Sequence, residues 1–373
     1  MRHKMGNAGS GWDRRVLGAA VTVGAMAMTV NAQWTVVNLH PGGASKSEIR
    51  GVYGDQQVGY ATVDGKMRAS LWNGSAASWE DLNPAGATSS CLNGVHEGQQ
   101  VGCAVMDGPY HAGLWAGSAM SWVDLHTAGT MWSVASDAYG DQQVGGTVVR
   151  DYWHASLWNG TAGSWVDLNP AGATGSWAIG VYGAQQAGYT YTGASYTRHA
   201  GLWTGSVASW VDLTPTGATD SCAWAVYDGQ QVGAATVEGV TRASLWNGTA
   251  ASWVDLNPAG ATESWANDVY AGRQVGYAWV DSVQSAGLWN GSAASWVDLH
   301  GFLPPDFTWS EARGIWDDGA SVYVVGDGWN ATTGRQEALM WISPVPEPAS
   351  GLVLGAGLAA LAMFCRRSRS YGR

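Results

Sequence analysis

The stretch that decides the fold is "WVDLTPTGATDSCAWAVYDGQQVGAATVEGVTRASLWNGTAAS", residues 210–252. It contains four short apolar or alternating runs, at 209–213 (beginning one residue upstream), 222–227, 231–237 and 242–246. Pro215 and Gly217 separate the first two runs, and Asp-Gly, Glu-Gly and Asn-Gly pairs follow the others. Glycine after Asn or Asp accepts the positive φ angles of tight hairpins, and proline cannot donate to a strand ladder. The stretch therefore predicts four short β-strands.

The same pattern recurs along the chain. A Leu-Trp pair, or Met-Trp in the last copy, recurs with steps of 43, 43, 45, 43, 43 and 52 residues, at Trp72, Trp115, Trp158, Trp203, Trp246, Trp289 and Trp341. A Val-Gly pair and a Trp-Val-Asp-Leu motif follow the same period. The last motif reaches seven copies when "QWTVVNLHPGG" (33–43) is aligned with "SWVDLNPAG" (164–172), with Val36 in place of Trp.

Seven repeats of four strands predict an all-β fold, a seven-bladed β-propeller over residues 33–343. The coils of a β-solenoid are shorter, and a sandwich domain needs roughly 100 residues. The displaced first motif predicts the closure. Residues 34–40 should form the outer strand of the last blade, paired with residues 336–342.

The N-terminal segment, residues 1–32, has the features of a signal peptide. Basic residues at positions 2, 4, 14 and 15 precede an apolar run over 16–30, and Val30-Asn31-Ala32 fits the small-x-small cleavage rule. We therefore expect general secretion with cleavage after Ala32.

The C-terminal segment, residues 344–373, has three parts: a Pro-Glu-Pro motif, an apolar run over 351–364, and basic residues, the key positions being Pro346, Glu347, Pro348, Arg366 and Arg367. At about 1.5 Å per residue the apolar run spans roughly 21 Å, which is less than the ~30 Å hydrocarbon core of a bilayer. The arginines would stay on the cytoplasmic side during export. We expect a transient membrane helix here and not a permanent anchor.

This tripartite tail resembles the PEP-CTERM sorting signal of Gram-negative bacteria. The resemblance implies that an exosortase and the secretion machinery are partners. It also implies a location in the cell envelope, at the outer surface or in the extracellular matrix.

The repeats themselves resemble the extracellular HAF repeats, whose strand opening reads here His111-Ala112, His154-Ala155 and His199-Ala200. The position that gives this family its Phe is Ser or Gly in the six regular copies.

The charge balance excludes two classes of partner. Residues 33–343 hold 10 Lys and Arg against 27 Asp and Glu, a net charge of −17. Such a surface repels nucleic acid and anionic lipid head groups. We expect a monomer.

The recurring residues are predicted to be structural. The repeated tryptophans should fill the space between blades, and the repeated Asp and His residues should make hydrogen bonds to neighbouring turns. No known metal-ligand or catalytic motif occurs, so we predict no catalytic residue, metal or cofactor. Cys91 and Cys103 fall on neighbouring predicted strands, where either a disulfide or two buried free thiols fits the sequence.

The candidate ligand face is predicted from length variation. The seventh repeat is longer at 300–310 and at 326–336, and both insertions should emerge on the same side of the propeller. Loops carry function on rigid scaffolds, which makes Trp309, Trp316 and Trp329 the candidate ligand residues. Trp132, Trp153 and Trp279 also break the repeat pattern and are predicted to be exposed.

Three functions are compatible with the sequence. The first is a non-catalytic binding or structural module, with extracellular polysaccharide as the candidate ligand. The second is a polysaccharide-active propeller enzyme, a glycosidase or lyase. The third is a purely structural matrix protein. The near-identity of the repeats favours the first over the second, because a catalytic centre needs different groups from different blades.

Overall fold

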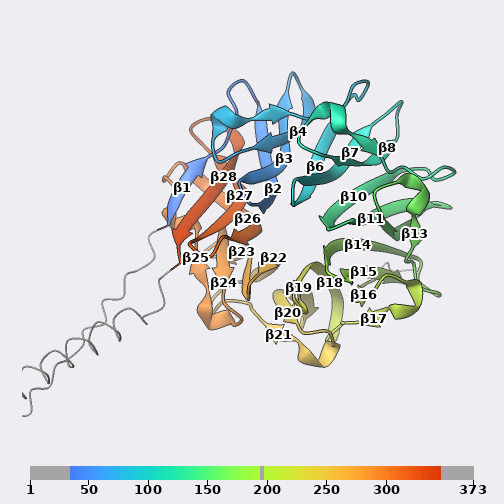
Figure 1. Ribbon diagram of the computed structural model, residues 1–373. Helices are drawn as coiled ribbons and strands as arrows, with labels where there is room; N and C mark the ends of the chain where they lie inside the picture. The colour runs from blue at the N-terminus through green and yellow to red at the C-terminus, as the bar shows by residue number, and fades with distance from the viewer. Residues whose placement is uncertain (1–33, 194–196, 346–373) are drawn as a thin grey trace, which may run out of the picture. The chain divides into compact units, whose positions relative to one another are not determined.

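The computed structural model describes residues 34–193 and 197–345, and these form seven four-stranded antiparallel sheets. The sheets follow one another around a common axis, and the first packs against the last (Figure 1). The predicted seven-bladed β-propeller is confirmed. In the first six sheets the innermost strand comes first in the chain, and the next three lie successively further out.

The first six blades are each built from four consecutive strands. Blades one to three contain β2 (Lys46–Tyr53), β3 (Gln56–Val63), β4 (Lys66–Trp72), β5 (Glu80–Asp81); β6 (Ser90–His96), β7 (Gln99–Val105), β8 (Tyr110–Trp115), β9 (Val123–Asp124); and β10 (Ser133–Tyr139), β11 (Gln142–Val149), β12 (Tyr152–Trp158), β13 (Val166–Asp167). Blades four to six contain β14 (Gly175–Tyr182), β15 (Gln185–Thr192), β16 (Thr197–Trp203), β17 (Val211–Asp212); β18 (Ala218–Tyr227), β19 (Gln230–Val237), β20 (Val240–Trp246), β21 (Val254–Asp255); and β22 (Glu263–Tyr270), β23 (Arg273–Val280), β24 (Val283–Trp289), β25 (Val297–Asp298).

Short 3-10 helices lie between the third and fourth strands of these blades: η1 (Ala76–Ser78), η2 (Ala119–Ser121), η3 (Ala162–Ser164), η4 (Val207–Ser209), η5 (Ala250–Ser252) and η6 (Ala293–Ser295). A further one, η7 (His300–Phe302), lies in the longer connection into blade seven. Among the described residues no helix is long and apolar enough to cross a membrane. The predicted signal peptide, the Pro-Glu-Pro motif and the apolar sorting segment lie outside those residues.

Blade seven joins the two ends of the described chain. It consists of β26 (Phe307–Asp317), β27 (Ser321–Asn330), β28 (Arg335–Pro344) and, as its outer strand, β1 (Thr35–Asn38). Val36 lies opposite Trp341 and Asn38 opposite Leu339. The Leu39 N–H extends the pairing by donating to the Ala338 carbonyl at 2.8 Å. The predicted closure by the N-terminal strand is confirmed.

The turns have the geometry that their residues favour. Asp228 and Gly229, between β18 and β19, have φ angles of 45° and 82°. Positive φ at both central residues matches the right-handed twist of the flanking strands. This explains why Asp-Gly marks a hairpin in this chain.

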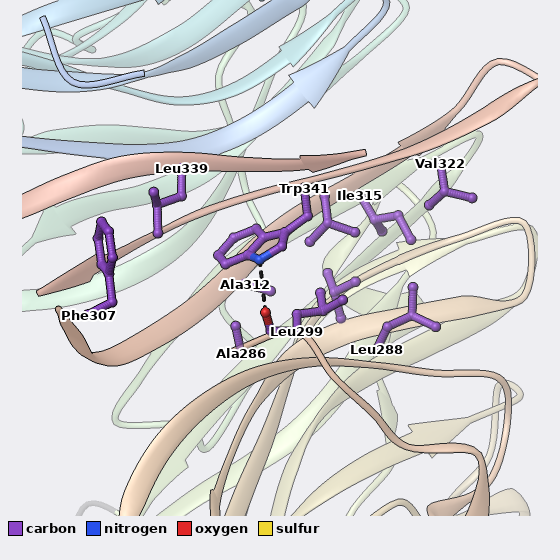
Figure 2. Close-up of a cluster of buried hydrophobic side chains, with 11 residues drawn as sticks. Ala286, Leu288, Leu299, Phe307, Ala312, Ile315, Val322, Leu339 and Trp341 are labelled. Carbon is purple, nitrogen blue, oxygen red and sulfur yellow. Dashed lines mark hydrogen bonds between the residues drawn. The ribbon is translucent and has the colours of Figure 1, made fainter. Parts of the chain in front are cut away.

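The repeated tryptophans form the core between blades. All seven Leu-Trp or Met-Trp indoles are fully buried. Figure 2 shows Trp341 among side chains of blades six and seven, with its indole N–H donating to the Leu299 carbonyl at 3.0 Å. The predicted core role is confirmed.

A repeated hydrogen bond ties each blade to the next. In blade two the Ala112 N–H donates to the Ser133 hydroxyl of blade three at 2.9 Å. Equivalent bonds are accepted by Ser47, Ser90, Ser176, Ser221, Ser264 and Ser310. The bond from Ala338 to Ser47 closes this set between blades seven and one.

Candidate functional site

Every innermost strand carries a β-bulge at the same place. The register shifts by one residue in each blade, which leaves one extra residue: Arg50, Asn93, Ser136, Ile179, Trp224, Asn267 and Arg313. A bulge re-aims a side chain and sharpens the local twist. Here all seven of these residues line one cavity of about 700 Å³ on the propeller axis.

The blades differ where they face this cavity. The bulge position holds two arginines, two asparagines, a serine, an isoleucine and a tryptophan. The near-identity of the repeats therefore does not extend to the axis, where different blades do supply different groups. The framework residues repeat because every blade must pack on its neighbours, and the axial residues are free from that constraint.

One side of the cavity is aromatic. Trp177 and Tyr189 of blade four, Trp224 of blade five, and Trp265 and Tyr277 of blade six all line it. The rings of Trp224 and Trp265 lie 6.2 Å apart, and the Trp177 indole N–H donates to the Ser136 hydroxyl at 2.9 Å. These contacts hold the rings in place before any ligand arrives.

The other side, from blades seven and one, is charged. Arg313 donates from Nε to Asp327 Oδ1 at 2.6 Å and from Nη2 to Glu311 Oε2 at 3.1 Å. Arg50 donates from Nε to Glu48 Oε1 at 2.9 Å. Two guanidinium groups therefore face three carboxylates, so this side carries no net positive charge.

The protonation of these carboxylates follows their surroundings. Burial disfavours the charged form of Glu48, but Arg313 and Arg50 outweigh it and bring its pKa down to about 2. Burial raises the pKa of Asp327 and of Glu311, although Arg313 opposes it in both. Both Glu311 oxygens have partners, because Oε1 accepts from the Asn267 amide at 3.0 Å.

Two aspartates mark the inner limit of the cavity. Asp137 and Asp268 follow the bulge residue in blades three and six and line both the large cavity and a second one of about 210 Å³ on the opposite side. Each accepts two backbone N–H groups, one from its own blade and one from the next. Burial nevertheless raises the pKa of each to about 7.

The second cavity is ringed by aromatic side chains at the ends of the inner strands. Each of these rings lies 4.4–4.6 Å, centroid to centroid, from the next one, in the order Tyr53, His96, Tyr139, Tyr182, Tyr227 and Tyr270. The ring of Trp316 lies 5.9 Å from that of Tyr53.

The predicted ligand face is only partly assembled. The two insertions do meet, since the Ala331 N–H donates to the Asp306 carbonyl at 2.8 Å, and Trp309 lies opposite Trp329 across β26 and β27. Trp316 is at the other end of the same hairpin, opposite Tyr323. Trp309 and Trp316 therefore lie toward opposite ends of the β26–β27 hairpin, with six residues between them, and the role of the three tryptophans in ligand binding stays a prediction.

The repeated Asp and His residues bond to each other. Asp124 Oδ1 accepts the His126 N–H at 2.8 Å, and its Oδ2 contacts His111 Nδ1 at 2.8 Å. The Asp167–His154, Asp212–His199 and Asp255–Arg242 pairs repeat the second contact in later blades. The hydrogen bonds predicted for the repeated Asp and His residues are therefore present. Within the described chain, no group of three His, Cys, Asp or Glu side chains could hold a metal ion.

Cys91 and Cys103 are brought together. They lie directly opposite on β6 and β7 with their Sγ atoms 3.3 Å apart, both as buried free thiols. A hydrogen bond from the Cys103 thiol lowers the pKa of Cys91 to about 7. The disulfide stays a prediction for an oxidising compartment.

The axial residues were missed because strand alternation does not show a bulge. One extra residue reverses the face of everything after it, so period-2 patterning cannot tell which side chains reach the axis. A signal was present in the blade-to-blade variation at one position inside an otherwise repeated strand.

Comparison with known proteins bears on the tail and on the fold. Residues 344–369 match the family model described as the PEP-CTERM protein-sorting motif. The predicted motif is confirmed, and this motif implies export and sorting by an exosortase. No curated protein sequence matches the chain.

Solved structures share the fold at low identity. An oligogalacturonate lyase in complex with manganese is 12% identical over 85% of this chain and 95% of its own, with a TM-score of 0.52. A prolyl endopeptidase structure is 9% identical over 79% of this chain and 48% of its own, with a TM-score of 0.53. The structure of puromycin hydrolase is 14% identical over 79% of this chain and 52% of its own, with a TM-score of 0.46. The chain thus spans about half the length of two of these. At such identities the likeness concerns the propeller alone.

Proposed function

We propose that this exported propeller is a non-catalytic module that binds a neutral glycan of the extracellular matrix in its axial cavity. The observation that carries the proposal is the division of the cavity into an aromatic side and a hydrogen-bonding side. Aromatic rings offer flat apolar faces, and a few placed polar groups fix the orientation of a bound ligand. A sugar ring needs both, because it has apolar faces and a rim of hydroxyl groups.

The charges of the site favour a neutral ligand. Arg50 and Arg313 are matched by Glu48, Glu311 and Asp327, and the rest of the exported chain is acidic. A polyanion would meet repulsion at the surface and no net positive charge in the cavity.

The carboxylates support a binding role over a catalytic one. A general acid or base must exchange its proton with a substrate atom within hydrogen-bond reach. Both oxygens of Glu311 are engaged by Arg313 and Asn267, and both oxygens of Asp137 and of Asp268 accept backbone N–H groups. These groups are held as part of the framework.

The test is a glycan array probed with residues 33–343 and with the Trp224→Ala variant. Trp224 lines the cavity from a bulge and is not one of the seven buried interblade indoles, so its truncation should leave the fold intact. We expect binding to neutral glycans, weakened at least about tenfold in the variant, as for a central aromatic anchor. Trp279→Ala is the matched control, because Trp279 is 38% exposed and does not line the cavity.

Three results would contradict the proposal. Binding that Trp224→Ala leaves unchanged would place the ligand elsewhere. Absence of binding to every glycan would favour a purely structural protein. Release of reducing ends from a polysaccharide by the wild-type chain would show catalysis and overturn the non-catalytic part.

A further inference from the structure

Three tryptophans form a row of neighbouring rings from the protein surface beside the start of β10 to the axial cavity. Trp132 immediately precedes β10, and its ring lies 6.5 Å from that of Trp153 on β12. The Trp153 ring in turn lies 4.4 Å from that of Trp177 on β14, which lines the cavity. We call these three residues the tryptophan track.

The outer end of the track is open to solvent. Trp132 is 43% exposed, and its chain neighbour Met131 and Tyr152, the residue before Trp153, are also exposed. Large apolar side chains gathered on the surface of a soluble protein mark an interaction site more often than isolated ones do. The other end needs no such partner, because Trp177 packs among Tyr189, Tyr191 and Trp224.

In blade three, a glycine leaves room for the rings of Trp153 and Trp177. Gly146 stands where blades one, four and six have tyrosine and where blade seven has Asp327. A Cβ atom at Gly146 would lie 2.9 Å from the ring of Trp153 and 3.1 Å from that of Trp177. The missing side chain is therefore what allows the two indoles to approach each other.

We propose that the tryptophan track extends the axial site, so that the protein binds a polysaccharide chain lengthwise, with one part in the cavity and the following sugar units on Trp153 and Trp132. The inference rests on the proposed function of the cavity. Its own support is the continuity of ring contacts from the cavity wall to the surface. A ligand confined to the cavity would leave the Trp132 end without a role, and a polyanionic chain is disfavoured by the acidic surface.

The experiment uses a glycan array on which each neutral sugar is present as the single unit and as oligomers of increasing length. Residues 33–343 are compared with Trp132→Ala and, as matched control, Trp279→Ala. Trp279 has similar exposure, and the described residues give its ring no aromatic contact. We expect wild-type affinity to rise with chain length, and Trp132→Ala to remove about tenfold of that gain while leaving the shortest bound ligand unaffected.

A second variant perturbs the track without removing a tryptophan. Gly146→Ala should displace the Trp153 ring and reduce the same length-dependent gain, since its new methyl group meets both indoles. Equal loss for short and long ligands in both variants, or affinity that does not change with length in the wild type, would overturn the track while leaving the cavity site standing. A wild-type chain that binds no glycan of any length would overturn the cavity site and the track together.

Discussion

At the scale of the residue, Asp137 and Asp268 are distinct from the aspartates of the repeated Trp-Val-Asp-Leu motif. They stand at the position after the bulge, where the other blades have glycine or alanine, and both are half-buried in the wall of the axial cavity. Their backbone partners keep them hydrogen-bonded, but burial still raises the pKa of each to about 7. Each group thus binds its proton more tightly in the folded state than in the unfolded one.

Because of this difference, the free energy of unfolding depends on pH. Between roughly pH 4 and 7 the unfolded state ionises these groups while the folded state holds them protonated, so each removes up to about 1.4 kcal/mol of stability per pH unit as the pH rises. We expect the double variant Asp137→Ala/Asp268→Ala to gain in Tm relative to wild type as the pH rises from 5 to 7. Scanning calorimetry at several pH values measures that difference.

The comparison with wild type removes other titrating groups from the result. The histidines whose pKa burial lowers, such as His126 and His300, change stability in the opposite direction but are common to both proteins. Asp55→Ala, at an exposed turn, is the control substitution. A difference in Tm that stays constant over this range would show that the two aspartates do not titrate there.

At the scale of the element, β1 performs a closure that no other strand shares. It pairs over four residues with β28, and Leu39 directly after it is fully buried. Trp34 and Val36 pack against the core of blades six and seven. The loss of the repeated tryptophan at Val36 is accommodated because Val36 is only half-buried at this edge.

Deletion of residues 33–41 should therefore destabilise the whole propeller. Truncating one buried leucine costs about 2–5 kcal/mol, and the deletion removes a leucine together with a strand ladder. We expect the Tm of the entire domain to fall by at least about 5 °C, measured by circular dichroism.

Residues 33–345 provide the matched truncation, and their Tm should equal that of residues 33–373. If the deletion of 33–41 left the melt equally unchanged, the closure would contribute nothing to stability.

At the scale of the whole molecule, the charge distribution separates the framework from the site. Residues 33–343 have a net charge of −17, whereas the arginines at the axis are neutralised by neighbouring carboxylates. Long-range steering of a charged ligand would depend on ionic strength, because exposed charges are screened beyond about 10 Å at 0.1 M salt. A neutral ligand has no such dependence.

Glycan affinity should therefore change by less than about twofold between low and high salt. Isothermal titration with the best array ligand checks this. An affinity that falls steeply with salt would instead identify an acidic ligand and a functional role for Arg50 or Arg313. Nonuronic and uronic versions of the same oligomer distinguish the two cases directly.

Much of this molecule follows from its sequence alone. The 43-residue period, the turn pairs such as Asp228-Gly229, and the offset of Val36 determine the number of blades and the closing strand. The same period identifies the buried tryptophans and the structural Asp and His residues, because a residue needed for packing between blades must recur in every blade. The sorting motif can also be recognised from the sequence, because it is one short contiguous stretch of residues.

The axial site was decided only by the tertiary structure. Arg50, Trp224 and Arg313 lie in different blades, up to 263 residues apart, and meet because the ring closes. A one-residue bulge turns each of them toward the axis, and strand alternation gives no sign of it. The tryptophan track has the same origin, since Trp132, Trp153 and Trp177 come from two blades and Trp153 meets Trp177 where Gly146 leaves room. Packing between neighbours repeats and can be counted along the chain, whereas convergence on the axis depends on how all seven blades are placed in space.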